Sequence, residues 1–303
     1  MMMDKVTIRS FVENNPNLVT MKKQSNGYYV LKYKNKVFYK NLWTPELLEC
    51  RGTVVDENFN IIQRPFTKIY NLHERGSTIP RDEIVIASRK INGFMCAVTK
   101  HNGELLISTT GSCDSPFVGL ARQLIYDTTN IPAKLHGAVS WLFEIVHPED
   151  PHIVKDDVGV YLLANRRKEW DAEECFNNEY ELDAHAAELG CKRPEWYRAE
   201  FGHIQQWTKR CNHEGFVCYG KDTTLKMKSP YYLVTKFLAR MRGEKLDTII
   251  NTNPDSLKER IDEEYYPLID YIVEWKGMFT ALDEQKRISF IEEYFKGQLD
   301  NES

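Results

Sequence analysis

The feature that most constrains the fold of this chain is an abrupt change of pattern near residue 235. Before it, short runs of alternating apolar and polar residues are separated by turn residues, which is typical of antiparallel strands. After Tyr232 the apolar residues recur at the spacing of amphipathic helices, and no strand pattern follows. The sequence therefore predicts an α+β domain over residues 1–235, built on antiparallel sheets, and a small all-helical domain over residues 236–303.

Turn residues and helix caps locate the individual elements. Asn92-Gly93 and the "HNG" at 101–103 divide residues 83–110 into three predicted strands, with Asn-Gly as a hairpin turn. Further predictions are a hairpin over 26–40 with "KNK" at its tip, strands at 52–55, 61–64, 139–148 and 158–167, a helix starting at Ser115-Pro116, a helix over 171–190 ending at Gly190, a strand–turn–strand unit over 213–232, and helices within 233–250, 255–279 and 284–299.

Composition excludes several classes of protein. The hydrophobic fraction of 42% is sufficient for a core, and the net charge of -4 gives no overall attraction to nucleic acid, so any basic site must be local. The seven cysteines form no CxxC pair, which favours reduced thiols in a cytoplasmic protein. No segment is typical of a signal peptide or a membrane span, so we expect no membrane partner. Cys211, His213 and Cys218 leave a metal site open, although ordinary strand and loop residues are the simpler interpretation.

Charged residues stand at the ends of several predicted strands, in five short motifs. Taken singly, each motif has a plain structural interpretation, such as a turn with a solvated lysine or a paired core carboxylate. Taken together, they supply a lysine, two carboxylates and further cations beside strands of one sheet system. The motifs are Arg51-Gly52, Lys90-x-Asn92-Gly93, Phe143-Glu144, Glu214-Gly215 and Lys226-x-Lys228.

This combination of residues indicates phosphoryl chemistry with a lysine nucleophile. A lysine amine is a poor nucleophile at neutral pH because its ordinary pKa is about 10.4. Burial or neighbouring cations make the amine usable, and Arg51, Lys226 and Lys228 would supply those cations. The same cations would offset charge on a phosphate under attack, while carboxylates would hold a metal or ribose hydroxyls. The set predicts attack by Lys90 on the α-phosphate of a nucleoside triphosphate, in a chain without a GxxxxGK[ST] loop.

The order of the motifs resembles motifs I, III, IV and V of the covalent nucleotidyltransferases, which comprise ATP-dependent DNA and RNA ligases and mRNA capping enzymes. The segment "RGTVVDENFNIIQRPFTKIYNLHE" is similar to the region upstream of the nucleophile in the T4 RNA ligase 1 family. The segments "LFEIVHPEDPHIV", "YLLANRR" and "EGFVCYGKDTTLKMKSPYY" resemble later motifs of that family. The resemblance covers residues 48–236 and implies a nucleotidyltransferase (adenylation) domain followed by the helical domain.

The resemblance also implies a role for each site residue. Lys90 would become covalently adenylylated, and Gly93 would keep the backbone beside it compact. Glu144 would bind the ribose hydroxyls or the metal, and Glu214 would be a metal-binding and catalytic carboxylate. Phe143 would line the adenine pocket or simply pack in the core. The implied phosphate contacts are Lys226 and Lys228 at the α-phosphate, and Arg51 and Lys68 at the β- and γ-phosphates or the RNA end.

Three residues depart from the motifs of this family. Asn92 stands where an aspartate is frequent, and Phe94 where a small hydroxyl residue is common. Thr110 stands where a relative has a lysine, which puts one cationic phosphate contact in doubt. Ser112 is a further candidate contact in the same segment.

The implied function is that of an ATP-dependent RNA ligase. It would join RNA 5′-phosphate and 3′-hydroxyl ends through a lysyl-AMP and an RNA-adenylylate, using ATP and Mg²⁺, with Mn²⁺ as an alternative metal. The expected setting is repair of RNA, such as a cleaved tRNA, by a monomer in the cytoplasm of a virus-infected cell. The alternatives are a capping-type guanylyltransferase that uses GTP and a non-catalytic RNA-binding protein on the same fold. The charged residues that start the helical domain bind the RNA backbone or are ordinary helix-surface charges: Lys236, Arg240, Arg242 and Lys245.

Overall fold

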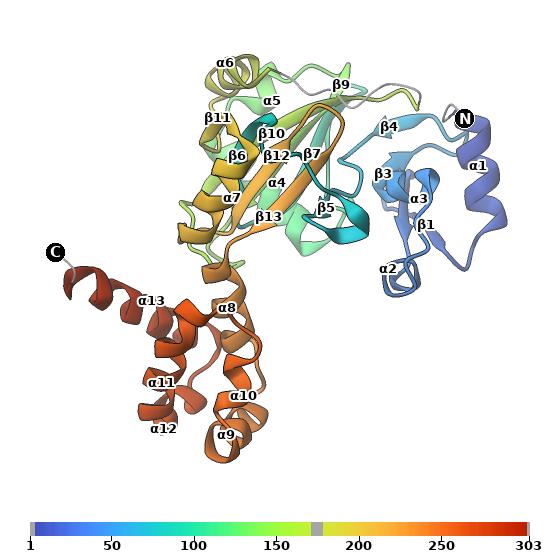
Figure 1. The fold of residues 1–303 in the computed structure, drawn as a ribbon. Helices are drawn as coiled ribbons and strands as arrows, with labels where there is room; N and C mark the ends of the chain where they lie inside the picture. The colour runs from blue at the N-terminus through green and yellow to red at the C-terminus, as the bar shows by residue number, and fades with distance from the viewer. Residues whose placement is uncertain (1–3, 171–177, 302–303) are drawn as a thin grey trace. The chain divides into compact units, whose positions relative to one another are not determined.

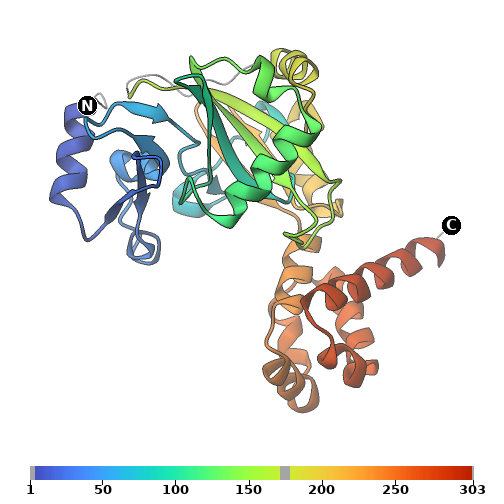
Figure 2. The ribbon, with the colours of Figure 1, turned by 180° about the vertical axis from the view of Figure 1, so that it is seen from behind.

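A computed structural model describes residues 4–170 and 178–301 of the chain. The chain folds into two compact units, each assembled from separate segments. Figures 1 and 2 show the helices and strands from two opposite sides. Unit 1 contains Met1–Tyr70, Ile91–Asp150 and Asp156–Trp196, and unit 2 contains Asn71–Lys90, Pro151–Lys155 and Tyr197–Ser303. Strands pair antiparallel in both units, which confirms the predicted α+β class.

The first sheet of unit 1 has the strand order β1-β2-β3-β4. Its core contains the fully buried side chains of Ile8, Leu31 and Leu47. The strands predicted at 52–55 and 61–64 are confirmed as β3 and β4. The elements are α1 (Lys5–Asn14), β1 (Val19–Lys23), β2 (Tyr29–Tyr33), α2 (Asn35–Tyr39), α3 (Pro45–Glu49), β3 (Arg51–Val55) and β4 (Ile61–Gln63).

The hairpin predicted over residues 26–40 is wrong. Its first half is β2, but β2 pairs with β1 and β3, and the "KNK" segment begins helix α2. The helical turn buries only Val37 and leaves Phe38 and Tyr39 exposed, whereas a strand would place Val37 and Tyr39 on one face. Burial of that single valine in the core therefore decided against the alternating pattern.

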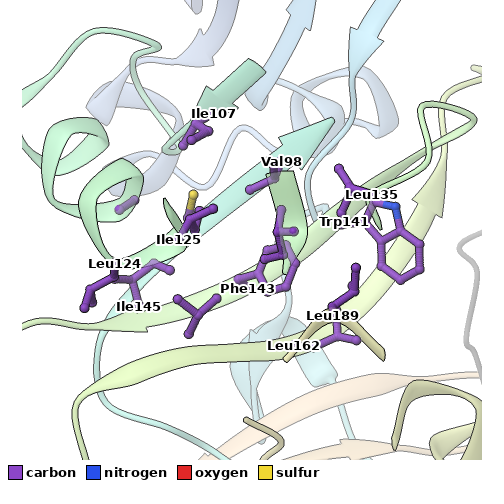
Figure 3. Close-up of a cluster of buried hydrophobic side chains, with 14 of the residues drawn as sticks. Val98, Ile107, Leu124, Ile125, Leu135, Trp141, Phe143, Ile145, Leu162 and Leu189 are labelled. Atoms are coloured by element: carbon purple, nitrogen blue, oxygen red, sulfur yellow. The ribbon is translucent and has the colours of Figure 1, made fainter. Parts of the chain in front are cut away.

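The second sheet of unit 1 has the order β10-β9-β7-β8 and carries the largest apolar core of this unit. Helices α4 and α6 pack their apolar residues against one face of this sheet, as the side chains in Figure 3 show. Predictions confirmed here are the helix start after Ser115, the helix end at Gly190, and the break between strands at "HNG", where Asn102 and Gly103 have positive φ. The elements are β7 (Phe94–His101), β8 (Glu104–Ser108), α4 (Pro116–Thr128), α5 (Ile131–Lys134), β9 (Val139–Val146), β10 (Gly159–Arg167) and α6 (Glu179–Leu189).

Part of one predicted helix lies outside the described residues. The helix predicted over 171–190 is confirmed as α6 from Glu179 onward, and residues 171–177 are among those that the structure does not describe.

The sheet of unit 2 has the order β11-β6-β12-β13-β5. Helix α7 covers one of its faces, where Val85, Ala87, Ile204 and Phe216 form a buried cluster. The predicted strand–turn–strand unit over 213–232 is confirmed as β12 and β13. The elements are β5 (Tyr70–Asn71), η1 (Glu74–Gly76), β6 (Ile84–Arg89), β11 (Trp196–Glu200), α7 (Phe201–Arg210), β12 (Gly215–Tyr219) and β13 (Thr224–Lys228).

The part of unit 2 after β13 is helical, as predicted, and has an apolar core of its own that includes Leu238, Leu246, Ile269 and Phe279. The predicted division at residue 235 falls inside α8 and stays a prediction. No described helix combines the length and apolar character needed to cross a bilayer. The elements are α8 (Pro230–Ala239), α9 (Gly243–Thr252), α10 (Asp255–Lys258), η2 (Glu263–Tyr265), α11 (Tyr266–Glu274), α12 (Lys276–Ala281) and α13 (Glu284–Asn301).

A buried cluster of three charges holds unit 1 together. Glu49, which is 7% exposed, accepts from Arg64 at 2.9 Å and from Arg166 at 2.8 Å. The two guanidiniums also donate to backbone carbonyls, Arg166 to Pro65 at 2.6 Å and Arg64 to Trp170 at 3.2 Å. The cluster therefore joins α3, the segment after β4, β10 and the segment after β10 through one carboxylate.

Candidate active site

Three predicted site residues of unit 2 form one ionic cluster around Glu214. The ammonium of Lys90 lies 2.9 Å from Glu214 Oε2, and that of Lys228 lies 3.3 Å from Glu214 Oε1. The Glu214 side chain is 4% exposed, while the two lysines keep about a quarter of their side-chain surface in solvent, 23% and 24%. A buried carboxylate thus holds two partly exposed cations side by side.

The sheet of unit 2 fixes this geometry through its backbone. Lys90 follows β6 directly, and its N–H donates to the carbonyl of Gly215 at 2.8 Å. Gly215 is in turn the register partner of Lys228 on β13. A side chain at position 215 would place its Cβ 2.0 Å from the Met227 carbonyl oxygen, at a φ of +129° that favours glycine. The Glu-Gly motif therefore exists because the strands approach closely beside the lysines.

Lys226 lies on the same face of β13 as Lys228, two residues earlier. Its carbonyl accepts the N–H of Leu72 at 2.9 Å, which ties β13 to the segment after β5. Both lysines line a cavity of about 500 Å³. The structure therefore brings the Lys-x-Lys motif to an open, partly polar hollow in unit 2.

Helix α8 adds two residues that sequence reasoning did not assign to this site. The Ser229 hydroxyl caps the helix by accepting from the N–H of Tyr232 at 3.1 Å. The ring of Tyr232 is within cation–π distance of two ammoniums, 4.8 Å from that of Lys228 and 5.6 Å from that of Lys236. The sequence signal for Tyr232 was the "SPYY" helix start directly after the Lys-x-Lys motif.

The charges of the cluster shift the pKa values of two α8 residues, Tyr232 and Lys236. Burial, followed by the charge of Glu214, raises the pKa of Tyr232 to about 12, so its hydroxyl is neutral at physiological pH. Burial, together with Lys228 and Arg240, lowers the pKa of Lys236. Lys236 therefore belongs electrostatically to the cluster around Glu214.

In unit 1, Glu144 and Gly93 are in direct contact. Glu144 is 9% exposed on β9, and its Oε1 accepts the N–H of Gly93 at 3.2 Å. A Cβ at position 93 would lie 2.1 Å from the Ile145 carbonyl oxygen. Gly93 is therefore required by close backbone approach to β9, which agrees with the predicted compact backbone at this position.

We expect Gly93→Ala to destabilise the chain and slow formation of any nucleotide adduct on Lys90. The added methyl would force β7 and β9 apart, at a cost of about 1–3 kcal/mol for overpacking. Urea unfolding and adduct labelling measure the two effects.

Gly119→Ala is the matched control for this prediction. Gly119 lies in α4, and no described atom lies within 4 Å of the position that its Cβ would take, so alanine should stabilise the chain by about 0.5–1 kcal/mol. Equal stability of the Gly93→Ala variant and the natural chain would contradict the steric argument.

The hairpin predicted at Asn92-Gly93 is wrong. The strands before and after it, β6 and β7, belong to different sheets, so the segment is a connection between sheets. Asn92 is 4% exposed, and its N–H donates to Asp156 Oδ2 at 2.7 Å. No sequence signal pointed to Asp156. Its carboxylate lies beside Asn92, the position where the T4 RNA ligase 1 family often has an aspartate.

Phe143 lies in the core of unit 1. It is fully buried, and it packs with Val98, Ile145 and Leu162 on the sheet face covered by α4 (Figure 3). Glu144, the next residue, points to the other face by strand alternation. Of the two roles considered for Phe143, core packing is the one that its burial supports.

Arg51 lies at the start of β3, beside a second cation that the sequence did not reveal. Lys32 is its register partner on β2. The close neighbour of Gly52 is Thr110, and the Lys32 ammonium would lie 2.9 Å from a Cβ placed on Gly111. Lys32 thus brings an ammonium to the segment where Thr110 replaces the lysine of a relative.

Lys68 lies against aromatic rings. Its ammonium is 4.5 Å from the ring centroid of Tyr70, 5.2 Å from that of Trp43 and 5.6 Å from that of Phe38. These distances are typical of cation–π contacts. To reach a phosphate, the ammonium would have to leave these rings or bind the phosphate at their edge.

The other candidates have structural roles. Ser112 is buried and donates to Gln24 and Asp114. Cys218 is packed in the core under α7, and His213 Nδ1 accepts the N–H of Gly215 at 3.1 Å. Within residues 4–170 and 178–301, no group of three or more His, Cys, Asp or Glu side chains could hold a metal ion. The metal alternative for Cys211, His213 and Cys218 is therefore not supported.

A comparison with known families decides what kind of protein carries these motifs. A family model described as RNA ligase matches residues 49–232, which is more than half of the chain. The chain belongs to the RNA ligase family. The matched range is close to the residues 48–236 over which the resemblance was expected.

Two curated relatives of this RNA ligase family member are proteins of viruses. It is 30% identical over 149 residues to RNA ligase 1 of Bacteriophage TS2126, covering 41% of this chain and 37% of the relative. It is 25% identical over 240 residues to a proposed bifunctional polynucleotide kinase/RNA ligase of Autographa californica nuclear polyhedrosis virus, covering 67% of this chain and 33% of the relative. The chain thus spans about a third of the length of the curated relatives it matches.

A solved structure confirms the ligase nucleotidyltransferase fold. The archaeal ATP-dependent RNA ligase, form 1, aligns with a TM-score of 0.61 at 17% identity, covering 92% of this chain and 78% of that chain. The helical region after β13 is present in this RNA ligase family member as the sequence predicted.

Proposed function

We propose that this protein is an ATP-dependent RNA ligase that uses Lys90 as its nucleophile. The observation that carries the proposal is the cluster in unit 2, where a buried carboxylate holds Lys90 beside a second lysine, in a chain of the RNA ligase family. Attack by Lys90 Nζ on the α-phosphorus of ATP would form an N–P bond and break the bond to the leaving pyrophosphate. Glu214 Oε2 lies 2.9 Å from the Lys90 ammonium and would accept the proton that Lys90 must release before attack.

The neighbouring lysines would have a different task. Lys228 shares the carboxylate with Lys90, and Lys226 lies on the same strand face, so both can offset charge that develops on the α-phosphate. The Tyr232 ring beneath the Lys228 ammonium would hold it in place without neutralising it. We assign Lys226 and Lys228 to the α-phosphate and Tyr232 to positioning Lys228.

The unit 1 residues would bind the rest of the nucleotide. Glu144 would accept from the ribose hydroxyls. Arg51, Lys32 and Lys68 would contact the outer phosphates or the RNA 5′-phosphate. Lys32 is added to the set because its ammonium lies over Gly111.

The later steps follow from the chemistry of the adduct. AMP would pass from Lys90 to an RNA 5′-phosphate, and the 3′-hydroxyl of a second end would then displace AMP and form the phosphodiester. We propose RNA repair as the setting, with a cleaved tRNA as one substrate, by a monomer in the cytoplasm of an infected cell. The bacteriophage and nuclear polyhedrosis virus relatives support the viral part of this proposal.

The metal that the family implies would come largely with the nucleotide. Magnesium usually binds through one or two carboxylates, substrate phosphates and waters. Glu144 and Glu214 are the carboxylates that fit this task, although each already accepts from protein groups, Gly93 in one case and the two lysines in the other. When bound, Mg²⁺ or Mn²⁺ would offset phosphate charge.

The test is to incubate the protein with Mg²⁺ and either α-labelled ATP or α-labelled GTP. We expect label from ATP to remain on the denatured protein through a P–N bond that alkali leaves intact and acid cleaves, and label from GTP to be absent. Addition of RNA with a 5′-phosphate and a 3′-hydroxyl should remove the label and yield sealed RNA. Labelling by GTP would favour the guanylyltransferase alternative, and absence of any adduct would favour the non-catalytic RNA-binding alternative.

A further inference from the structure

Unit 2 contains a second cavity that the proposed reaction does not use. Its volume is about 720 Å³, and four cationic side chains line it: Arg89, Lys155, Arg210 and Lys296. Among the described residues of its lining, Glu292 is the one carboxylate. We call it the cationic cavity. In a chain with a net charge of -4, such a local excess of positive charge indicates an anionic ligand.

Aromatic side chains form another part of the cavity wall. Tyr231, Tyr265 and Phe295 line it, and the Phe295 ring packs edge-on against the other two at centroid distances of 5.3 and 5.8 Å. The rings therefore form one continuous surface from α8 to α13. Cations beside an aromatic surface are the combination that binds the phosphates and bases of single strands.

The cationic cavity is separate from the cluster around Glu214. Arg89 shares the face of β6 with Val85 and Ala87, which pack under α7, whereas Lys90 follows β6 and contacts Glu214. None of the described residues assigned to nucleotide chemistry lines the cavity. A ligand there would not occupy the place of ATP.

The cations differ in how strongly they are already engaged. Lys155 contacts Glu292 at 3.2 Å and Ser289 at 3.3 Å, so part of its charge is balanced. Lys296 pairs with Glu293 at 3.2 Å but is 67% exposed, and solvent screening leaves such a pair weak. Arg210 is exposed at the end of α7. Arg210 and Lys296 are therefore the cations most accessible to an incoming phosphate.

We propose that the cationic cavity binds one or two nucleotides of single-stranded RNA. Arg210 and Lys296 would contact phosphates, and bases would stack on Phe295 and its neighbours. The volume lies in the range of pockets that hold molecules of nucleotide size. This inference rests on the proposed function only in its choice of RNA as the ligand.

The test measures RNA binding without catalysis. An RNA of about 12 nucleotides, within the site sizes of single-strand binders, carries fluorescein, a 5′-hydroxyl and a 3′-phosphate, so it cannot be sealed. Anisotropy gives Kd for the full chain over a salt series, without ATP. We expect the double variant Arg210→Gln/Lys296→Gln to bind roughly tenfold more weakly. The slope of log Kd against log salt concentration, which we call the salt slope, should fall by about 1.4 if contacts to two phosphates are lost.

The matched control is Arg9→Gln/Lys286→Gln. Lys286 lies on α13 like Lys296, is 71% exposed and forms the same kind of i,i+3 pair, but it does not line the cavity. We expect this control to leave Kd and salt slope unchanged. Replacing one base by 2-aminopurine adds a stacking readout, in which quenching on binding should weaken in Phe295→Leu.

The outcomes separate the two proposals. Equal Kd and slope in the cavity variant and the control would overturn the cationic cavity as an RNA site. Tighter binding of polyglutamate than of RNA would overturn it in favour of an acidic protein partner. Adenylylation is measured without RNA, so failure of the proposed function would appear as a missing adduct while the RNA-binding result still decides this inference.

Discussion

Lys90→Ala should abolish transfer of AMP to the protein, with a loss of about 10⁴-fold or more in the rate of adduct formation, because removal of a covalent nucleophile leaves no alternative acceptor. The fold should persist, since the Lys90 side chain is partly exposed and its loss removes one ion pair with Glu214. Labelling with α-labelled ATP measures the rate, and urea unfolding measures the stability. An undiminished adduct would contradict the assignment of the nucleophile.

Two further variants sharpen this result. Lys90→Arg keeps a positive charge that can pair with Glu214, but a guanidinium does not give up its proton to attack phosphorus. We expect it to be as inactive as alanine, which would separate the role of the amine from that of the charge. Lys221→Ala is the control, because Lys221 is exposed in the turn at the other end of the β12–β13 hairpin. Its adduct formation should equal that of the natural chain.

Glu49→Ala should lower the free energy of unfolding by about 3–5 kcal/mol, because it leaves two buried guanidiniums without their shared carboxylate. Arg64 and Arg166 side chains are each 3% exposed, so water cannot replace the lost partner. Urea unfolding measures the change. Glu13→Ala is the matched control: its pair with Arg9 is also 2.9 Å long, but both side chains are about half exposed, and we expect a loss of about 0.3–0.5 kcal/mol.

The same cluster predicts a pH dependence of stability. Burial by itself would raise the pKa of Glu49, but Arg166 and Arg64 outweigh it, and the pKa lies below its ordinary value of 4.5. A carboxyl group whose pKa is lower in the folded state contributes stability that is fully present above the unfolded value. That contribution is lost as the pH falls from the unfolded pKa through the folded one. The Glu49→Ala variant should lack this part of the acid sensitivity, and an unchanged acid profile would contradict the assignment.

Signals that act over a few residues were sufficient to predict many of the elements. Ser115-Pro116 and Gly190 marked helix ends because capping and left-handed backbone depend on the residue itself. Asn102-Gly103 formed its predicted turn for the same reason. The helices after Tyr232 followed from their apolar spacing, since one face of each had to be buried.

The wrong predictions share one cause. An Asn-Gly pair and an alternating segment indicate a turn and a strand, but neither indicates which strand will be the partner. At Asn92-Gly93 the chain passes between two sheets, and Gly93 is needed for contact with β9. At residues 34–40 only Val37 is buried in the core, and the segment forms a helical turn where a strand was predicted.

The sequence by itself determined the α+β class, the helical C-terminal region and the identity of the charged motifs, because these depend on local spacing and on the order of residues. Only the tertiary structure decided that Lys90 and Lys228 share one buried carboxylate, since residues 90 and 214 meet only when β6 pairs with β12. It also added Tyr232, Lys32 and Asp156, whose proximity to the motifs depends on the packing of separate elements. The residue types determine which reactions the side chains can carry out, whereas the distances between those side chains depend on how the whole chain folds.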